Sequence, residues 1–189
     1  AHEAGKDVAR LQSGDPSVWS ALAEQVRRLS ELGIDYEIVP GVPAFSAAAA
    51  ALGHELTVPT VGQSVVLTRI SGRASKMPEG ETLENFGRTG ATLCIHLAAH
   101  DIDRVVEELT PHYGEHGPVA VVAFASRPEQ VILRGTLSDI AQQVKDAGVT
   151  RTAVIIVGKV LTAEAFPDSY LYSDDRPRDE HGRTIPCVH

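Results

Sequence analysis

The stretch VARLQSGDPSVW, residues 8–19, decides the fold, because it joins a short apolar segment to a helix through an abrupt turn. Residues 8–11 favour a pleated surface and predict a short buried strand. Gly14 permits a backbone conformation that a residue with a Cβ resists. Asp15 is a good N-cap, and Pro16 fits the first helical position, where a missing N–H costs nothing.

Apolar residues then recur at helical spacing, which predicts a helix over 16–32 that Gly33 ends. A loop between such a strand and helix leaves the carboxyl end of the strand, and open α/β sheets bind ligands there. A plain strand–helix turn has the same local pattern, so both interpretations stay open for this stretch alone.

Composition indicates an ordinary globular protein. The 189 residues are 43% hydrophobic and 22% charged, enough for one large domain or two small ones. A net charge of −8 argues against a nucleic-acid surface. Two cysteines, Cys94 and Cys187, make no disulfide framework, so we expect a reducing cytoplasm. Because apolar runs stay below membrane-spanning length, we expect no membrane partner.

Further along, predicted strands alternate with predicted helices, which indicates an α/β fold with mainly parallel or mixed sheets. The strands are expected at 36–39, 63–70, 91–98, 118–125, 131–133 and 152–161, and the intervening helices at 46–52, 83–88, after Asp101 and after Asp139.

An irregular stretch at 57–62 suggests two αβα lobes, with residues 1–62 in the first and 63–172 in the second. Residues 173–189 read as a charged, flexible tail. The chain opens without Met on what resembles a helix end closed by Gly5, so we expect the first lobe to be N-terminally incomplete.

Two stretches are candidate ligand sites. Arg69, Arg73 and Lys76 form a dense cationic group around a glycine-containing loop. Such a group is either a solvated loop or a clamp for a polyanionic small molecule, since Arg offers paired donors to carboxylates. The alanine run at 47–51 permits close approach, either of a packed sheet or of a ligand.

Common catalytic motifs are absent from the sequence. It has no P-loop, no Gly-x-Ser-x-Gly elbow and no Cys-x-x-Cys. His96 and His100 straddle a strand end, and His112 and His116 flank a loop glycine. Neither spacing favours a metal site, so we expect no metal, and spacing alone assigns no catalytic acid or base.

Several ordered motifs carry a family resemblance. Residues 8–16 resemble the Arg-Leu-x-x-Gly-Asp-Pro motif of the tetrapyrrole (corrin/porphyrin) methylases, and IVPGVPAFSAA at 38–48 resembles their Val-Pro-Gly motif. Residues 56–75 and 151–158 resemble in particular the branch that methylates carbon 11 of precorrin-4. The chain lacks the family's Gly-x-Gly-Pro-Gly loop, and Pro43 stands where the family often has Ser or Thr.

The resemblance implies a cytoplasmic, homodimeric C-methyltransferase of cobalamin biosynthesis. It would use S-adenosylmethionine, release S-adenosylhomocysteine, and act between its two lobes on an anionic tetrapyrrole. The residues implied in cofactor binding are Ser13, Gly14, Asp15, Pro43, Ala44, Leu97, Ala125 and Gly158. The carboxylates of such a substrate would give Arg69, Arg73 and Lys76 a reason to cluster.

Two alternatives share parts of this pattern. A sibling methylase, acting at another ring position or on a protein as diphthine synthase does, would carry the same Gly-Asp-Pro and Pro-Gly-Val motifs. A non-catalytic ligand-binding or interaction domain would fit an incomplete first lobe.

Overall fold

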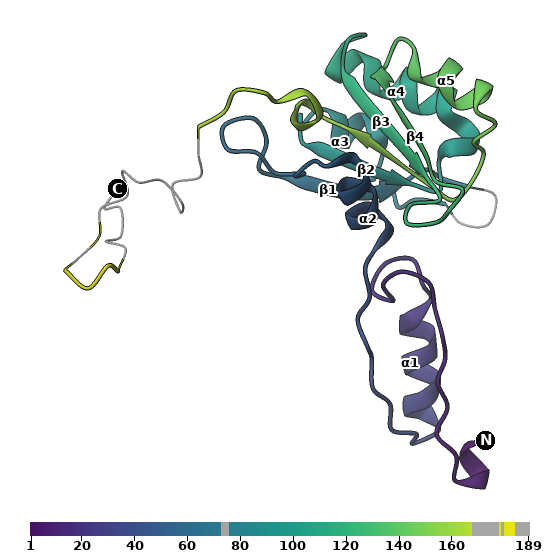
Figure 1. The fold of residues 1–189 in the computed structure, drawn as a ribbon. Coiled ribbons are helices and arrows are strands. Elements are labelled where there is room, and N and C mark those ends of the chain that lie inside the picture. The colour runs from purple at the N-terminus through teal and green to yellow at the C-terminus, as the bar shows by residue number, and fades with distance from the viewer. Residues whose placement is uncertain (73–75, 168–177, 179, 184–189) are drawn as a thin grey trace.

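The computed structural model describes residues 1–72, 76–167, 178 and 180–183. In this part of the chain a mixed sheet with helices on both faces forms the body, and a helical arm extends from it (Figure 1). Of the predicted tail at 173–189, residues 178 and 180–183 lie within the described residues. The described helices are all too short or too polar to cross a membrane.

The sheet of the described residues has five strands in the order β1-β2-β5-β3-β4. Their bounds are β1 Val65–Arg69, β2 Thr92–His96, β3 Pro118–Ala123, β4 Val131–Thr136 and β5 Ala153–Val157. The β1–β2 pair is parallel, whereas β5 runs antiparallel to both β2 and β3, and β4 antiparallel to β3. The five predicted strands between 63 and 161 are therefore confirmed, in a sheet that is mixed.

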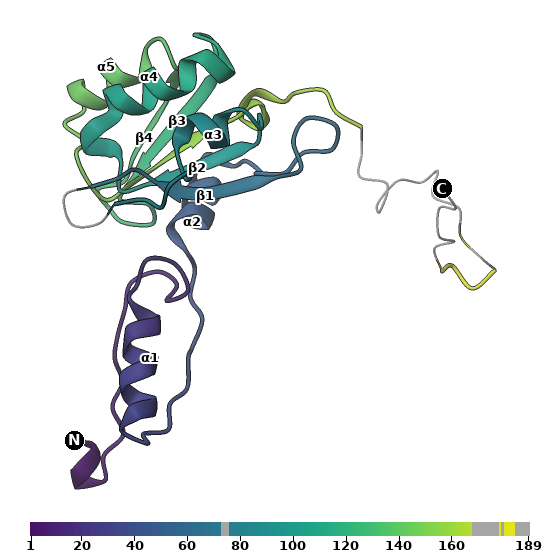
Figure 2. The same ribbon diagram turned by 180° about the vertical axis from the view of Figure 1, so that it is seen from behind.

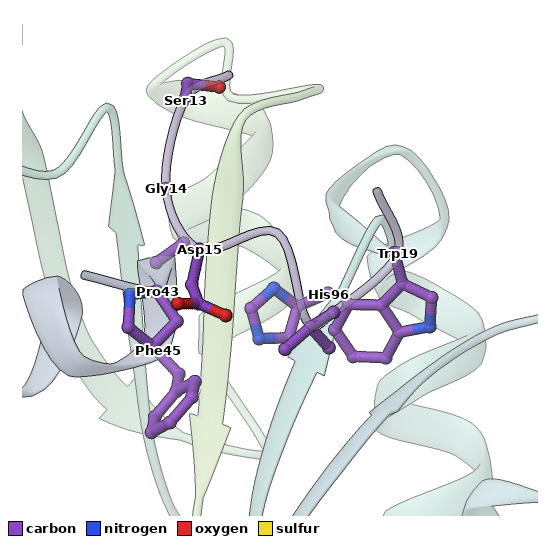
Figure 3. Close-up of a pocket in the computed structure, with 9 residues that line it drawn as sticks. Ser13, Gly14, Asp15, Trp19, Pro43, Phe45 and His96 are labelled. Carbon is purple, nitrogen blue, oxygen red and sulfur yellow. The ribbon is translucent and has the colours of Figure 1, made fainter. Parts of the chain in front are cut away.

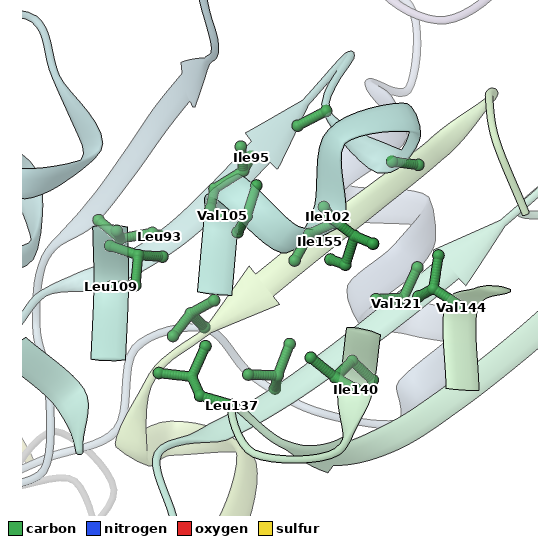
Figure 4. Close-up of a cluster of buried hydrophobic side chains, with 14 of the residues drawn as sticks. Leu93, Ile95, Ile102, Val105, Leu109, Val121, Leu137, Ile140, Val144 and Ile155 are labelled. Atoms are coloured by element: carbon green, nitrogen blue, oxygen red, sulfur yellow. The ribbon is translucent and has the colours of Figure 1, made fainter. Parts of the chain in front are cut away.

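Three helices cover one face of the sheet: α3 (Leu83–Gly87), α4 (Ile102–Tyr113) and α5 (Ile140–Asp146). Their apolar stripes and every second strand residue form the larger core, drawn in Figure 4. Val105 and Leu109 of α4 and Ile140 of α5 are fully buried against Leu93 and Ile155. The helical spacing predicted after Asp101 and Asp139 is thus confirmed.

The opposite face is covered by α2 (Ala44–Leu52), which carries the alanine run. Ala48 and Leu52 are buried against Cys94, Val122 and Ile156 of the sheet. Small side chains let the helix approach the strands closely, so the run serves tight helix–sheet packing. The division into lobes at residue 62 stays a prediction, and α2 belongs to the same packed body as the sheet.

The arm contains α1 (Leu22–Glu31), flanked by two irregular segments that run along it (Figures 1 and 2). The strands predicted at 8–11 and 36–39 are wrong. A β-strand is defined by backbone hydrogen bonds to a neighbouring strand, and these segments have no partner strand among the described residues. Leu11 is 92% exposed and Val39 71% exposed.

The helix predicted from residue 16 begins six residues later. Residues 16–17 form a turn and residues 18–20 a bend, and Ala21 adopts a left-handed backbone at φ 58° before α1 starts. The Asp15 side chain accepts a hydrogen bond from the amide of Ser17 at 2.8 Å, which closes a local turn instead of capping a helix. The end of the helix is as predicted, because Gly33 is left-handed at φ 64°.

One edge of the sheet collects several strand ends. Arg69 of β1 is in register with His96 of β2, which pairs with Val154 near the start of β5. The carboxyl end of β3 lies at this edge too, since its Ala123 pairs with Ala153. Loops that leave these ends can therefore meet one ligand.

Candidate functional site

Two glycine-containing bends meet beside that edge. A Cβ on Gly41 would collide with the carbonyl oxygen of Gly14 and lie 3.0 Å from its carbonyl carbon. The amide of Gly41 donates a hydrogen bond to Oδ2 of Asp15 at 2.8 Å. The Gly-Asp-Pro and Pro-Gly-Val segments, 26 residues apart in sequence, therefore form one backbone unit.

Asp15 is the charged group of this unit. Its Oδ1 accepts hydrogen bonds from both the hydroxyl and the amide of Ser17. The Ser17 hydroxyl first, then the Gly41 amide and the Ser17 amide, lower the pKa of Asp15 below its ordinary value. The side chain is therefore a carboxylate at neutral pH, held between the two bends.

The unit encloses a hollow of about 110 Å³ together with the carboxyl end of β2 (Figure 3). Five of the predicted cofactor residues line it: Ser13, Gly14, Asp15, Pro43 and Ala44. The remaining lining residues, which sequence reasoning did not assign, are Val18, Trp19, Phe45 and His96. Typical ligand sites measure about 300–1,000 Å³, so the hollow would hold one part of an adenosyl cofactor.

His96 is the sheet's contribution to the hollow. Its ring lies 4.7 Å from the ring of Trp19, centroid to centroid, at an interplanar angle of 47°. Its Nε2 is buried, with no hydrogen-bond partner in the described part of the chain. Burial lowers the pKa of His96, because desolvation disfavours the imidazolium. The sequence signal that could have pointed to His96 is a titratable residue at the end of an apolar strand.

Leu97 and Ala125 follow β2 and β3, at the same edge of the sheet. Leu97 has a left-handed backbone at φ 54° and is 64% exposed. Phe124, before Ala125, is left-handed too, at φ 51°, and its amide donates to the Thr152 carbonyl at 2.9 Å. Non-glycine residues pay for such conformations, and they cluster at ligand sites.

Gly158 is not brought to this edge. It follows the carboxyl end of β5, which runs antiparallel to β2 and β3, and its amide donates to the carbonyl of Pro118 at 3.2 Å. A Cβ on Gly158 would lie 3.1 Å from Cα of Thr92, the first residue of β2. Close packing against β2 thus accounts for this glycine, and Leu97 and Ala125 lie at the other end of the strands.

The predicted cationic group is partly described. Arg69 ends β1, and its guanidinium donates to the carbonyls of Ile70 at 3.1 Å and Lys76 at 3.4 Å. The backbone of Ile70 and of Lys76 therefore lies against Arg69, and Lys76 is exposed. Arg73 lies outside the described residues. Arg69 and His96 share a register position, so the cationic loop starts next to the hollow.

These residues fit part of a sulfonium cofactor. Asp15 offers a fixed negative charge to a cationic group, and Gly14 and Ala44 leave room for close approach to the backbone. Among the described residues, His, Cys, Asp and Glu side chains form no group of three or more that would hold a metal ion.

Comparison with known proteins gives the same family. The model of the tetrapyrrole (corrin/porphyrin) methylases matches residues 1–141. A precorrin-4 C(11)-methyltransferase from Rhodococcus erythropolis is 65% identical over 181 residues, which cover 96% of this chain and 73% of the relative.

Two solved structures extend the match to the fold. The X-ray structure of a cobalt precorrin-4 methyltransferase, a cobalamin biosynthetic enzyme, superposes with a TM-score of 0.82 at 36% identity, covering 85% of this chain and 67% of that one. Uroporphyrin-III C-methyltransferase from Thermus thermophilus, complexed with S-adenosylhomocysteine, gives 0.69 at 25% identity, covering 85% and 69%. The chain therefore belongs to the tetrapyrrole (corrin/porphyrin) methylase family.

Proposed function

We propose that this chain is an S-adenosylmethionine-dependent methyltransferase that methylates carbon 11 of precorrin-4 in cobalamin biosynthesis. The carrying observation is the 65% identity with a precorrin-4 C(11)-methyltransferase over nearly the whole chain. The meeting of the Gly-Asp-Pro and Pro-Gly-Val bends in one hollow supports it, because both motifs of the family resemblance then face the same ligand.

S-Adenosylmethionine supplies an electrophilic methyl group on a sulfonium. The chain's own contribution is alignment, for which effective molarities of about 10⁵ M and more set the scale. We assign Ser13, Gly14, Asp15, Pro43 and Ala44 to the cofactor, with Asp15 as counter-charge to its cationic end. Leu97 and Ala125, at the same sheet edge, would border it.

The substrate's carboxylates would be bound on the β1 side of the hollow. Arg69 starts the cationic loop there, and Lys76 is exposed on the same loop. We assign both, together with Arg73, to the rim of the anionic macrocycle. Arg presents paired donors that match carboxylate oxygens.

The metal-free substrate is favoured over its cobalt complex. The relatives named for precorrin-4 are 56–65% identical, whereas those named for cobalt-precorrin-4 are 36–48% identical. A diphthine methylase has less support, because several curated relatives at 56–65% identity are named precorrin-4 C(11)-methyltransferase.

We also propose a cytoplasmic homodimer with two lobes. Cys94 is a free, buried thiol, which fits a reducing compartment. The arm leaves Val8, Leu11, Val39 and Val42 each at least 67% exposed, an apolar surface that a second copy would cover. Light scattering coupled to size exclusion measures the mass directly, and a monomer at micromolar concentration refutes the dimer.

The proposed reaction is tested with precorrin-4 and S-adenosylmethionine carrying a ¹³C-labelled methyl group. One labelled methyl at carbon 11 of the product, observed by ¹³C NMR, supports the proposal. Label at another ring carbon indicates a sibling methylase. Cofactor binding without label transfer indicates a ligand-binding domain that does not catalyse methyl transfer.

A further inference from the structure

The buried Nε2 of His96 binds neither the cofactor nor the substrate carboxylates in the proposed function. A buried nitrogen without a hydrogen bond is uncommon and calls for an explanation. His96 lines the same hollow as Asp15 and Pro43, and Figure 3 draws its imidazole between Asp15 and Trp19. A phenylalanine ring could pack against Trp19 equally well. The contact with Trp19 therefore does not explain why a ring with a buried nitrogen stands at this position.

His112 is an internal comparison. Its Nε2 is also buried without a partner in the described chain. Its ring packs against Gly87, where a Cβ would lie 2.8 Å from Cδ2 of His112. That site is a contact between α3 and α4 on the other face of the sheet, away from the hollow. The location of His96, and not burial alone, therefore singles it out.

We propose that His96 is a catalytic residue of the methyl transfer: its Nε2 accepts a hydrogen bond from a pyrrole N–H of the tetrapyrrole and takes the proton that methylation releases. This inference rests on the proposed function. It adds the proton acceptor, for which the sequence motifs assign no residue.

The proposed step breaks two bonds and forms two. The ring carbon forms a bond to the methyl carbon, and the C–S bond breaks with its electron pair going to sulfur. The sulfonium charge has then moved to the macrocycle. The N–H bond of a pyrrole breaks, its electron pair stays in the ring, and the proton moves to Nε2. His96 becomes an imidazolium and returns the proton to water after product release.

The surroundings of His96 suit an acceptor that is neutral before the reaction. Burial holds its pKa below the ordinary value, so the imidazole is uncharged at neutral pH. In the tautomer protonated on Nδ1, Nε2 can accept a proton. The charged groups on its side are Asp15 from the loop and Arg69, its register partner on β1. α2 and β5 consist of apolar residues and one serine. Asp15 lines the same hollow, and its negative charge favours the imidazolium once it forms.

Two variants separate the roles of the ring and its nitrogen. His96→Phe keeps a ring against Trp19 but removes the acceptor. His96→Gln keeps an acceptor oxygen that cannot hold a proton at neutral pH. His112→Phe is the matched control, because it removes a nitrogen that is likewise buried without a partner in the described chain but lies away from the hollow. S-Adenosylhomocysteine affinity and melting temperature are measured for all three variants and the wild type.

We expect His96→Phe to bind S-adenosylhomocysteine within about threefold of the wild type and to lose kcat by about 10²-fold or more, the scale of one acid–base group. His96→Gln should keep KM for precorrin-4 while losing kcat to a similar degree. The wild-type kcat should fall in acid as His96 becomes protonated, and this fall should be absent from the pH profiles of both variants. A kcat of His96→Phe within threefold of the wild type, or an unchanged fall of kcat in acid, overturns the proposal.

A readout without turnover keeps this inference separate from the proposed function. Protein with ¹³C-labelled histidine is titrated with precorrin-4 in the absence of cofactor, and the His96 signal is assigned by its loss in His96→Phe. A shift of that signal on binding, with the His112 signal unchanged, supports contact with Nε2. Binding of precorrin-4 without a shift overturns it. An inactive wild type that binds precorrin-4 with the shift refutes the proposed reaction and leaves the contact standing.

Discussion

The amide of Gly41 donates a hydrogen bond to the carboxylate of Asp15 at 2.8 Å, joining two bends that are 26 residues apart. Gly41 also lies against the carbonyl group of Gly14 with no room for a side chain. This junction forms the wall of the hollow in which the predicted cofactor residues gather.

Gly41→Ala is expected to lower the free energy of unfolding by about 1–3 kcal/mol, the usual cost of forcing a side chain into filled space. The added methyl would meet the Gly14 carbonyl, so one bend must shift. Gly72→Ala is the matched control, because a Cβ there has nothing within 4 Å. Chemical denaturation measures both, and equal stability of the two variants would contradict the close packing at Gly41.

Asp15→Asn is expected to destabilise the protein at neutral pH and not in acid. The hydrogen bonds lower the pKa of Asp15 in the folded state, so their contribution is present above the ordinary value of 3.8. It is lost as the pH falls from about 4 through the lower folded-state pKa. Melting temperatures of the wild type and Asp15→Asn should therefore differ at pH 7 and converge in acid.

The control for this experiment is Asp35→Asn, which removes an exposed carboxylate of the same arm. A melting-temperature difference between Asp15→Asn and the wild type that stays constant from pH 7 down to pH 2 would refute the role of the charge.

Trp19→Ala is expected to raise the pKa of His96 toward its ordinary value of 6.5. The indole packs against the imidazole, so its removal lets water reach the ring and relieves the desolvation that disfavours the charged form. Trp19→Phe, which keeps a ring in place, should leave the pKa nearly unchanged. NMR titration of the His96 signal measures both, and a lower pKa in Trp19→Ala would be inconsistent with the contact.

Leu97→Gly is expected to preserve stability while weakening cofactor binding. The substitution relieves a left-handed backbone that costs a non-glycine residue about 1–2 kcal/mol, and the side chain, 64% exposed, contributes little burial. Leu97→Ala removes the same side chain and keeps the strain, so it should be the less stable variant. If both variants bind S-adenosylhomocysteine as tightly as the wild type, the Leu97 side chain has no role in the site.

The sheet body could be predicted from sequence because its signals are local. Apolar runs at 91–98 and 118–125 indicate buried strands whichever partners they have, and the strands formed where expected. The arm could not be predicted in the same way, since a strand at 8–11 requires a partner that local propensity does not supply.

The residues of the candidate site could be predicted where a contiguous motif carries them. The lining residues that only the three-dimensional fold brings together, such as His96, could not. Ser13, Gly14 and Asp15 could be assigned because their motif is contiguous, and the structure gathers them with Pro43 and Ala44. Gly158 was grouped with Leu97 and Ala125 on the family resemblance alone, and the direction of β5 is not encoded in its apolar run. That strand runs antiparallel to β2 and β3, which puts Gly158 at the other edge of the sheet.

The most direct test of the account is calorimetric titration of S-adenosylhomocysteine into the wild type and into Gly41→Ala, at a temperature where both are folded. We predict micromolar binding by the wild type and at least tenfold weaker binding by Gly41→Ala. The reason is that the two bends can both contact the ligand only while Gly41 packs against the Gly14 carbonyl. Absence of binding by the wild type, or equal affinity of the two proteins, would contradict it.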